Sequence, residues 1–182
     1  ASGELRLAAK HAYGIGSPSR KDSKHPFYAL HVFEELDQPG EYYLDRQNNR
    51  LYFWPPEDVT KSPVRLTLCR QPLVRADGSA YLTVRDLTIE NGCDVGIVMR
   101  NGRHCRVEHC LVRNMGRSGI SLSGSHMAAV RCEVTQTGSS GISISGGDRK
   151  TLTPGQCSIE HCHVHHVGRL NWEGGRCAIL GG

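Results

Sequence analysis

The chain has 182 residues, of which 38% are hydrophobic, enough to bury a core in one domain with a small appendage. Its charges are scattered and sum to only +4, so composition alone selects neither nucleic acid nor an acidic polysaccharide as partner. No apolar run reaches the roughly 18 residues that a membrane-spanning helix needs. Residues 1–25 also lack the pattern of a signal peptide.

The first third of the chain differs in pattern from the rest. Residues 1–26 are basic and weakly periodic, which indicates an extension or loop. Residues 27–63 are predicted to form a β-hairpin subdomain, because "EYYLDRQNNRLYFWPP" places two aromatic-rich runs around Asn48 and Asn49. The rings of Tyr43, Tyr52 and Trp54 can stack on sugars, although such rings more often cover the flank or end of the neighbouring structure.

Residues 64–182 carry a repeat of about 23 residues. The stretch "YLTVRDLTIENGCDVGIVMRNG" from Tyr81 aligns with one from His104, one from Met127 and a partial one from Gln156. Apolar residues two positions apart recur in every copy, which is the spacing of a β-strand. The aligned columns include Val84, Val107, Val130 and Ile159; Ile97, Ile120 and Ile142; and Met99, Leu122, Ile144 and Ile179.

Three short strands per copy predict an all-β fold, a right-handed parallel β-helix of about four coils of 22–23 residues, preceded by the hairpin. A leucine-rich repeat would need a helical period, and a β-sandwich would not keep this register. We expect two ladders along the coils. One is polar, with Asn91, Asn114, Gln136 and His166, and one is ionic, with Arg85, Glu108, Arg131 and Glu160.

Small residues take particular places in this repeat. The glycines at 96, 119 and 141 open the third strand of each copy, a position that suits positive φ. The eight cysteines act as small apolar residues in the ladders, and Cys110, Cys132 and Cys162 share one column. Neighbours in that column lie within disulfide range, but a bridge would strain the stack, so free thiols are favoured.

The segment "CSIEHCHVHHVGR", from Cys157 to Arg169, has the composition of a zinc site. In the repeat register, however, Cys157 and Cys162 point inward whereas His163 and His165 point outward. Residues on opposite faces cannot converge on one ion. We therefore expect no metal and no cofactor.

Two insertions interrupt the period, "SGGDRKTLTPGQ" after Ile144 and "HHVGRLNWEGGRCA" after Val164. Insertions in a solenoid usually build its binding face, although solvated loops without function are about as common. On the binding interpretation, both would border a floor formed by Ser121 and Ser143. The candidate substrate-binding residues are Asp148, Arg149, Lys150, His165, His166, Trp172, Glu173 and Arg176.

The motifs "EELDQPGEYYLDRQNNRLYFWPP", "SGGDRKTLTPG" and "HCHVHHVGR" resemble those of bacterial right-handed parallel β-helix repeat proteins. These are similar in fold to pectate lyases and β-helical glycoside hydrolases, and the resemblance runs from about Pro26 to the end. It implies a secreted or periplasmic carbohydrate-active protein, whose signal peptide lies outside this chain and whose catalytic acids lie in later coils. It also implies that the chain is a fragment.

These observations favour a segment of a polysaccharide-degrading protein, a glycoside hydrolase rather than a lyase. The alternative is a non-catalytic carbohydrate-binding or structural β-helix, since no pair of carboxylates shares a column on neighbouring coils. Whether the chain is an enzyme stays open, and its catalytic residues are unknown. We expect a polysaccharide or oligosaccharide as partner, no nucleic acid and no membrane, and self-association through the open C-terminal coil.

Overall fold

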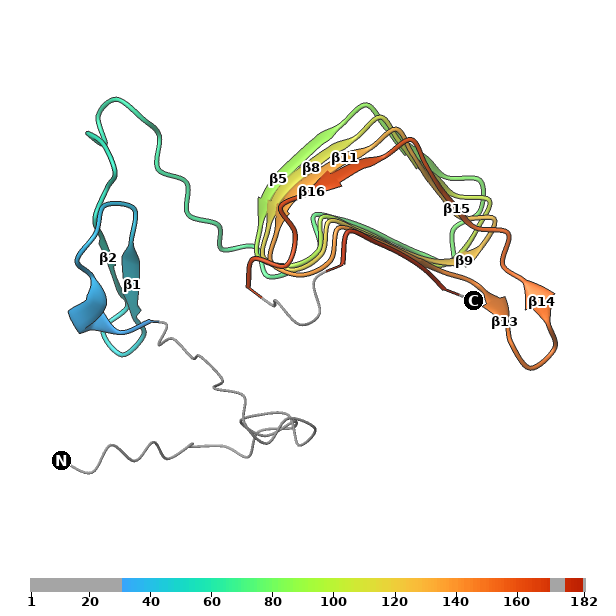
Figure 1. The fold of residues 1–182 in the computed structure, drawn as a ribbon, viewed down its shortest axis with the longest axis horizontal. Coiled ribbons are helices and arrows are strands. Elements are labelled where there is room, and N and C mark those ends of the chain that lie inside the picture. Colours follow the sequence, from blue (N-terminus) through green and yellow to red (C-terminus); the bar gives the residue numbers. More distant parts are fainter. Residues whose placement is uncertain (1–30, 171–175, 182) are drawn as a thin grey trace, which may run out of the picture. The chain divides into compact units, whose positions relative to one another are not determined.

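The computed structural model describes residues 31–170 and 176–181. The chain divides into two compact units, residues 1–64 and residues 65–182. Within the described residues the regular structure is almost entirely β, with one 3₁₀ turn at Phe33–Glu35 (Figure 1). No described helix is long and apolar enough to cross a membrane.

The first unit contains the predicted hairpin. Strand β1 (Tyr42–Asp45) pairs antiparallel with β2 (Arg50–Phe53), and Asn49 in the turn has a φ of 52°. The Asp45 carboxylate accepts hydrogen bonds from the backbone N–H groups of Gln47 and Asn48, which closes the turn. The hydrogen bond from the Asn48 side chain is the main cause of the lowered pKa of Asp45.

The aromatic rings of the hairpin pack within this unit. Phe33 makes edge contacts with Tyr43 and Tyr52, at centroid distances of 5.2 and 4.9 Å. His31 stacks on Tyr43 at 4.6 Å. Tyr43 and Tyr52 are therefore half-buried in a local ring cluster, whereas Trp54 is 46% exposed.

The second unit is a parallel β-helix with three strands per coil, as predicted. Figure 1 looks along the axis of the β-helix, so the traces of successive coils nearly superimpose. Sheet I contains β4 (Thr83–Arg85), β7 (Arg106–Glu108), β10 (Ala128–Val130) and β15 (Ser158–Glu160). Sheet II contains β5 (Thr88–Gly92), β8 (Leu111–Met115), β11 (Glu133–Thr137) and β16 (His163–His165). Sheet III contains β3 (Val74–Asp77), β6 (Ile97–Arg103), β9 (Ile120–Ser125), β12 (Ile142–Ser145) and β17 (Ala178–Gly181).

The core is a stack of apolar residues along the inside of the coils. Ile97, Ile120 and Ile142 are each 0% exposed and lie beside one another in sheet III. The next inward residue of β17 is Leu180, which pairs with Ile144. Ile179 pairs with Ser143 instead, so the predicted column through Ile179 was wrong by one residue.

Sheet I differs from the predicted alignment in its third coil. Val107 pairs with Ala129, not with Val130, and Ala129 pairs with Ile159. The stretch Ala128–Val130 offers three apolar residues in a row, so a two-residue period cannot fix which one points inward. The structure buries Ala129 completely and moves the coil by one position relative to the prediction.

The same shift removes the predicted ionic ladder. Glu108 pairs in register with Arg85 and Val130, while Arg131 lies in the following turn with a φ of 50°. Arg85 instead forms an ion pair with Asp86 at 2.8 Å. The ionic groups of sheet I are therefore joined within a coil rather than between coils.

The polar ladder is present near the C-terminal ends of the sheet II strands. Asn91, Asn114, Gln136 and His166 all have φ between 50° and 62°. Asn114 donates a side-chain hydrogen bond to Asn91 at 3.3 Å, and Gln136 accepts one from Arg169 at 3.1 Å. Amide side chains tolerate positive φ and can bond along the stack, which explains their recurrence here.

The glycines before sheet III are required for space rather than for positive φ, in contrast to the prediction. None of Gly96, Gly119 and Gly141 lies among the positive-φ residues. A Cβ atom on Gly119 would lie 2.3 Å from Cγ1 of Val134, and one on Gly141 would lie 2.2 Å from Cγ1 of Val164. The inward valines of sheet II therefore occupy the space that a side chain would need.

All eight cysteines are free, as the sequence favoured. In the Cys110, Cys132 and Cys162 column, Cys132 is 1% exposed and lies between the other two. Its hydrogen bond to Cys110, and then that to Cys162, raises the pKa of the Cys132 thiol. The central thiol is thus held protonated inside the core.

Candidate functional site

The first insertion forms a small hairpin beyond sheet III. Strands β13 (Gly147–Asp148) and β14 (Thr153–Pro154) pair antiparallel. The carboxylate of Asp148 accepts a hydrogen bond of 2.8 Å from the backbone N–H of Lys150. This bond is the main cause of the lowered pKa of Asp148, so the carboxylate stabilises the turn. The side chains of Asp148, Arg149 and Lys150 are exposed.

The described residues include only part of the second insertion. Trp172 and Glu173 lie outside the described residues. Arg176 is exposed, and its backbone carbonyl accepts a hydrogen bond of 2.9 Å from Gly141, just before β12 and β17 begin. Arg176 therefore lies at the start of sheet III, whereas the β13–β14 hairpin follows the end of β12. The four residues of β12 alone span roughly 13 Å.

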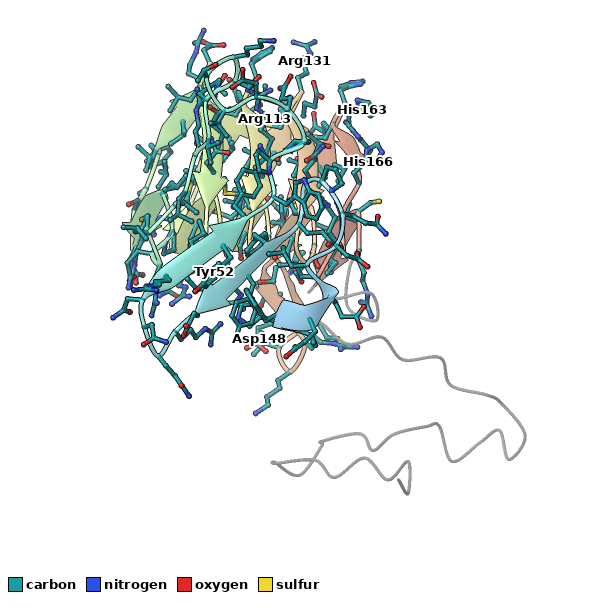
Figure 2. All side chains as sticks on the ribbon, turned by 90° about the vertical axis from the view of Figure 1, so that its left-hand side faces the viewer. Tyr52, Arg113, Arg131, Asp148, His163 and His166 are labelled. Atoms are coloured by element: carbon teal, nitrogen blue, oxygen red, sulfur yellow. The ribbon has the colours of Figure 1, made fainter. Side chains whose placement is uncertain are left out.

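His165 and His166 lie together at the end of β16. Their Nδ1 atoms are 2.6 Å apart, and Nδ1 of His165 is 3.2 Å from Oγ1 of Thr135. Figure 2 places His163 and His166 near one edge of the helix and Asp148 near the opposite edge. The structure thus unites the two histidines but does not bring the Asp148 hairpin to them.

A ladder of rings that the sequence did not reveal runs along the corner before sheet I. Tyr81, His104 and His126 occupy equivalent positions in successive coils, with φ of 56°, 54° and 55°. Tyr81 stacks on His104 at 4.9 Å with 2° between the ring planes, and His104 stacks on His126 at 4.1 Å. Tyr81 is 75% exposed, so the ladder reaches solvent, and its stacked rings present mainly their edges there.

An open depression of about 480 Å³ lies beside this ladder. Its lining from the outward row of sheet I consists of Thr83, Arg106, Ala128 and Ser158, and Gln156 continues the line of the rings into the fourth coil. Arg106 also donates to Glu108 at 2.5 Å, which fixes its position at the surface. Ring edges beside hydroxyl, amide and guanidinium groups offer many hydrogen-bonding atoms, which suits a polar ligand.

The ring ladder escaped the sequence alignment because of the one-residue error in the third coil. That alignment placed Met127, not His126, beside His104 and Tyr81. Met127 is 0% exposed and belongs to the core. A spacing of 22 residues from His104 would have aligned His126 and revealed three rings in one column.

Five carboxyls of the described residues have a shifted pKa, and none of these five has the raised pKa of a proton donor. The carboxyls whose pKa departs from its ordinary value are Asp45, Asp58, Asp86, Glu90 and Asp148. In all of them the pKa is lowered, and hydrogen bonds are the leading cause. A glycosidase needs one carboxyl that keeps its proton, which requires a raised pKa.

Comparison with known proteins gives two matches. A family model described as right handed beta helix region matches residues 59–181, and one described as GH141 insertion domain matches residues 1–56. No curated protein and no solved structure matches the chain. The β-helix match covers the part of the chain that carries both the ring ladder and the histidine pair.

Proposed function

The chain belongs to the right-handed β-helix family, and from this premise we propose that it binds a polysaccharide along the outer corner of sheet I. The similarity of residues 1–56 to a GH141 insertion domain relates the protein to glycoside hydrolases. The observation that carries the proposal is the Tyr81, His104 and His126 stack beside the open depression.

The geometry of the ladder suits a repeating ligand. Successive coils of a parallel β-helix lie about 4.8 Å apart, which is close to the length of one sugar residue in a chain. Because the rings stack face to face, each offers its edge rather than its face to a sugar, and the polar atoms of these edges can bond hydroxyls together with Arg106, Gln156 and Ser158. A polysaccharide running parallel to the helix axis would meet equivalent contacts at each coil.

We assign substrate binding rather than bond cleavage to these residues. The lowered pKa values of the shifted carboxyls support this division, because a deprotonated carboxylate cannot act as general acid. In the proposal, the whole protein is a secreted or periplasmic glycoside hydrolase. A purely carbohydrate-binding β-helix is the second candidate, favoured by the same carboxylates.

A glycan array tests the binding proposal. The unaltered chain should retain one class of polysaccharide, and the double variant Tyr81→Asn/His104→Asn should retain at least about tenfold less, since the ring stack that borders the site is removed while asparagine tolerates the positive φ. The matched control is His109→Asn, which alters an exposed histidine with a φ of 50° at another corner. Binding that the double variant leaves unchanged would overturn the proposal.

Product analysis tests the assignment of binding rather than cleavage to this chain. When the retained polysaccharide is incubated with this chain, chromatography should show no shortened products. Release of sugars would show that the chain contains catalytic acids and would contradict the division made above. The control variant His109→Asn, incubated in the same way, should give the same chromatogram as the unaltered chain.

A further inference from the structure

A second cluster, on the outer face of sheet II, has no part in the proposed carbohydrate site. Strands β11 and β16 are adjacent and parallel, and their register pairs Glu133 with His163 and Thr135 with His165. Val134 is 0% exposed and lies in the core beside Val164. Because successive residues of a strand face opposite sides, the two residues on either side of each valine share the outer face.

The ligand atoms of this cluster converge. One ligand atom from each of Glu133, His163 and His165 lies within 4.8 Å of the others. Nε2 of His165 is 3.5 Å from Oε1 of Glu133, and the rings of His163 and His165 stack at 4.4 Å. A tetrahedral zinc ion with bonds of 2.0–2.1 Å holds its ligand atoms about 3.4 Å apart, so binding requires the exposed side chains to rotate until the lone pairs of the two stacked imidazoles point at one ion.

The second nitrogen of His165 is already provided with partners. Its Nδ1 lies 3.2 Å from Oγ1 of Thr135 and 2.6 Å from Nδ1 of His166. When Nδ1 carries the proton and donates to one of these atoms, Nε2 keeps its lone pair on the side of Glu133. Metal-bound histidines usually have such a partner, which orients the ring and raises ligand basicity.

The charges around the cluster are compatible with a cation. Arg113 lies next to Thr135 in the register, but its guanidinium is 2.6 Å from the carboxylate of Glu90, which it shares with Arg65, so its positive charge is partly offset there. Glu133 is 50% exposed at its side chain and His165 31%, so an ion can enter from solvent. The alternative to an ion-binding role is that Glu133 and His165 simply form an ordinary contact at the protein surface.

We propose that Glu133, His163 and His165 bind a zinc ion. Two imidazoles and one carboxylate supply three ligands, and the fourth tetrahedral position stays open to water. The ligands come from two coils, which is why the sequence, searched within one coil, predicted no metal. The cysteines of "CSIEHCHVHHVGR" take no part, because Cys157 and Cys162 pack against the core.

The test uses Co²⁺ and Zn²⁺ with the full chain after treatment with a chelator. Calorimetry should show one Zn²⁺ bound per chain, and Co²⁺ should give the visible bands of a tetrahedral site without a thiolate charge-transfer band. His163→Thr and Glu133→Gln should abolish this binding. Thr135→Val should weaken it about tenfold, as expected for loss of a partner to a metal-bound histidine.

The matched control is His161→Asn, an exposed histidine of the same coil with a φ of 51° that asparagine tolerates. It should bind zinc as the unaltered chain does. Circular dichroism of each variant checks that the β-helix is intact. Absence of binding, a thiolate band, or binding that survives both His163→Thr and Glu133→Gln would overturn the proposal.

Discussion

Single residues show how closely the coils approach one another. Gly119 is the clearest case, because a Cβ atom there would meet Cγ1 of Val134 at 2.3 Å and the backbone oxygen of Gly141 at 2.9 Å. The backbone oxygen cannot rotate away, so the coil itself would have to shift. The glycine pattern could be predicted from the sequence, but its cause could not, since the clash involves a neighbouring coil.

Gly119→Ala should lower the free energy of unfolding by about 3 kcal/mol, the upper range for overpacking a dense core. Chemical denaturation of the full chain measures this. Gly181→Ala is the matched control, because a Cβ atom at Gly181 meets nothing within 4 Å. Equal stability of the two variants would contradict the close packing of coils at Gly119.

Glu90 joins two arginines on the outside of the helix. Its carboxylate is 2.6 Å from Nη1 of Arg65 and 2.6 Å from Nη2 of Arg113. The hydrogen bond from Arg113 is the main cause of its lowered pKa. A lowered folded-state pKa stabilises the fold above the ordinary value of 4.5, and this contribution is lost as the pH falls through the folded-state pKa.

Glu90→Gln should therefore lower the melting temperature slightly at neutral pH, and the difference should shrink as the pH is lowered from neutral to well below 4.5, through the lowered folded-state pKa of Glu90. Thermal melts of both chains at the two pH values measure it. Added salt should reduce the neutral-pH difference as well, since both arginines are exposed. A difference of the same size at both pH values would show that the ion pairs do not cause it.

At the scale of the strands, the stack of inward residues holds the coils together. Ile120 is 0% exposed and lies between Ile97 and Ile142, with neighbours in the coils on both sides. Leu180 is an inward residue of β17 but is 58% exposed. The cost of removing an apolar side chain should follow this difference in burial.

Ile120→Ala should lower the free energy of unfolding by about 3 kcal/mol, which is typical of a cavity in a core. Leu180→Ala should cost about 1 kcal/mol or less, because more than half of its side chain is already in water. Denaturant titration compares the two variants. A larger loss for Leu180→Ala would contradict the placement of the core.

The sequence predicts these strands well because each coil repeats the same inward positions. It predicts neighbours in adjacent coils less well, because the coils differ in length by one residue and the alignment gap can be placed at several points. In Ala128–Val130 the correct placement needs the observed burial of Ala129. That single shift hid the stack of His126 on His104. The nearness of Glu133 to His163 was missed for another reason, since the two residues lie in different coils and only the pairing of their strands brings them together.

For the whole molecule, the parallel coils turn single side chains into periodic surfaces. The corner before sheet I repeats a ring or amide at Tyr81, His104, His126 and Gln156, and sheet II carries the cluster around Glu133. The sequence could predict the β-helix and the candidate residues of its insertions. It could not place these surfaces, since both depend on which residues of separate coils become neighbours.

The central claim, that a polysaccharide follows the rings from coil to coil, is tested most directly by titration calorimetry with oligosaccharides of increasing length. Using the sugar identified on the array, affinity should rise with each added residue until the ligand spans the four positions from Tyr81 to Gln156, and then level off. His104→Asn should remove most of this increase because it interrupts the ladder. An affinity independent of length, or a length dependence that His104→Asn leaves unchanged, would contradict the account.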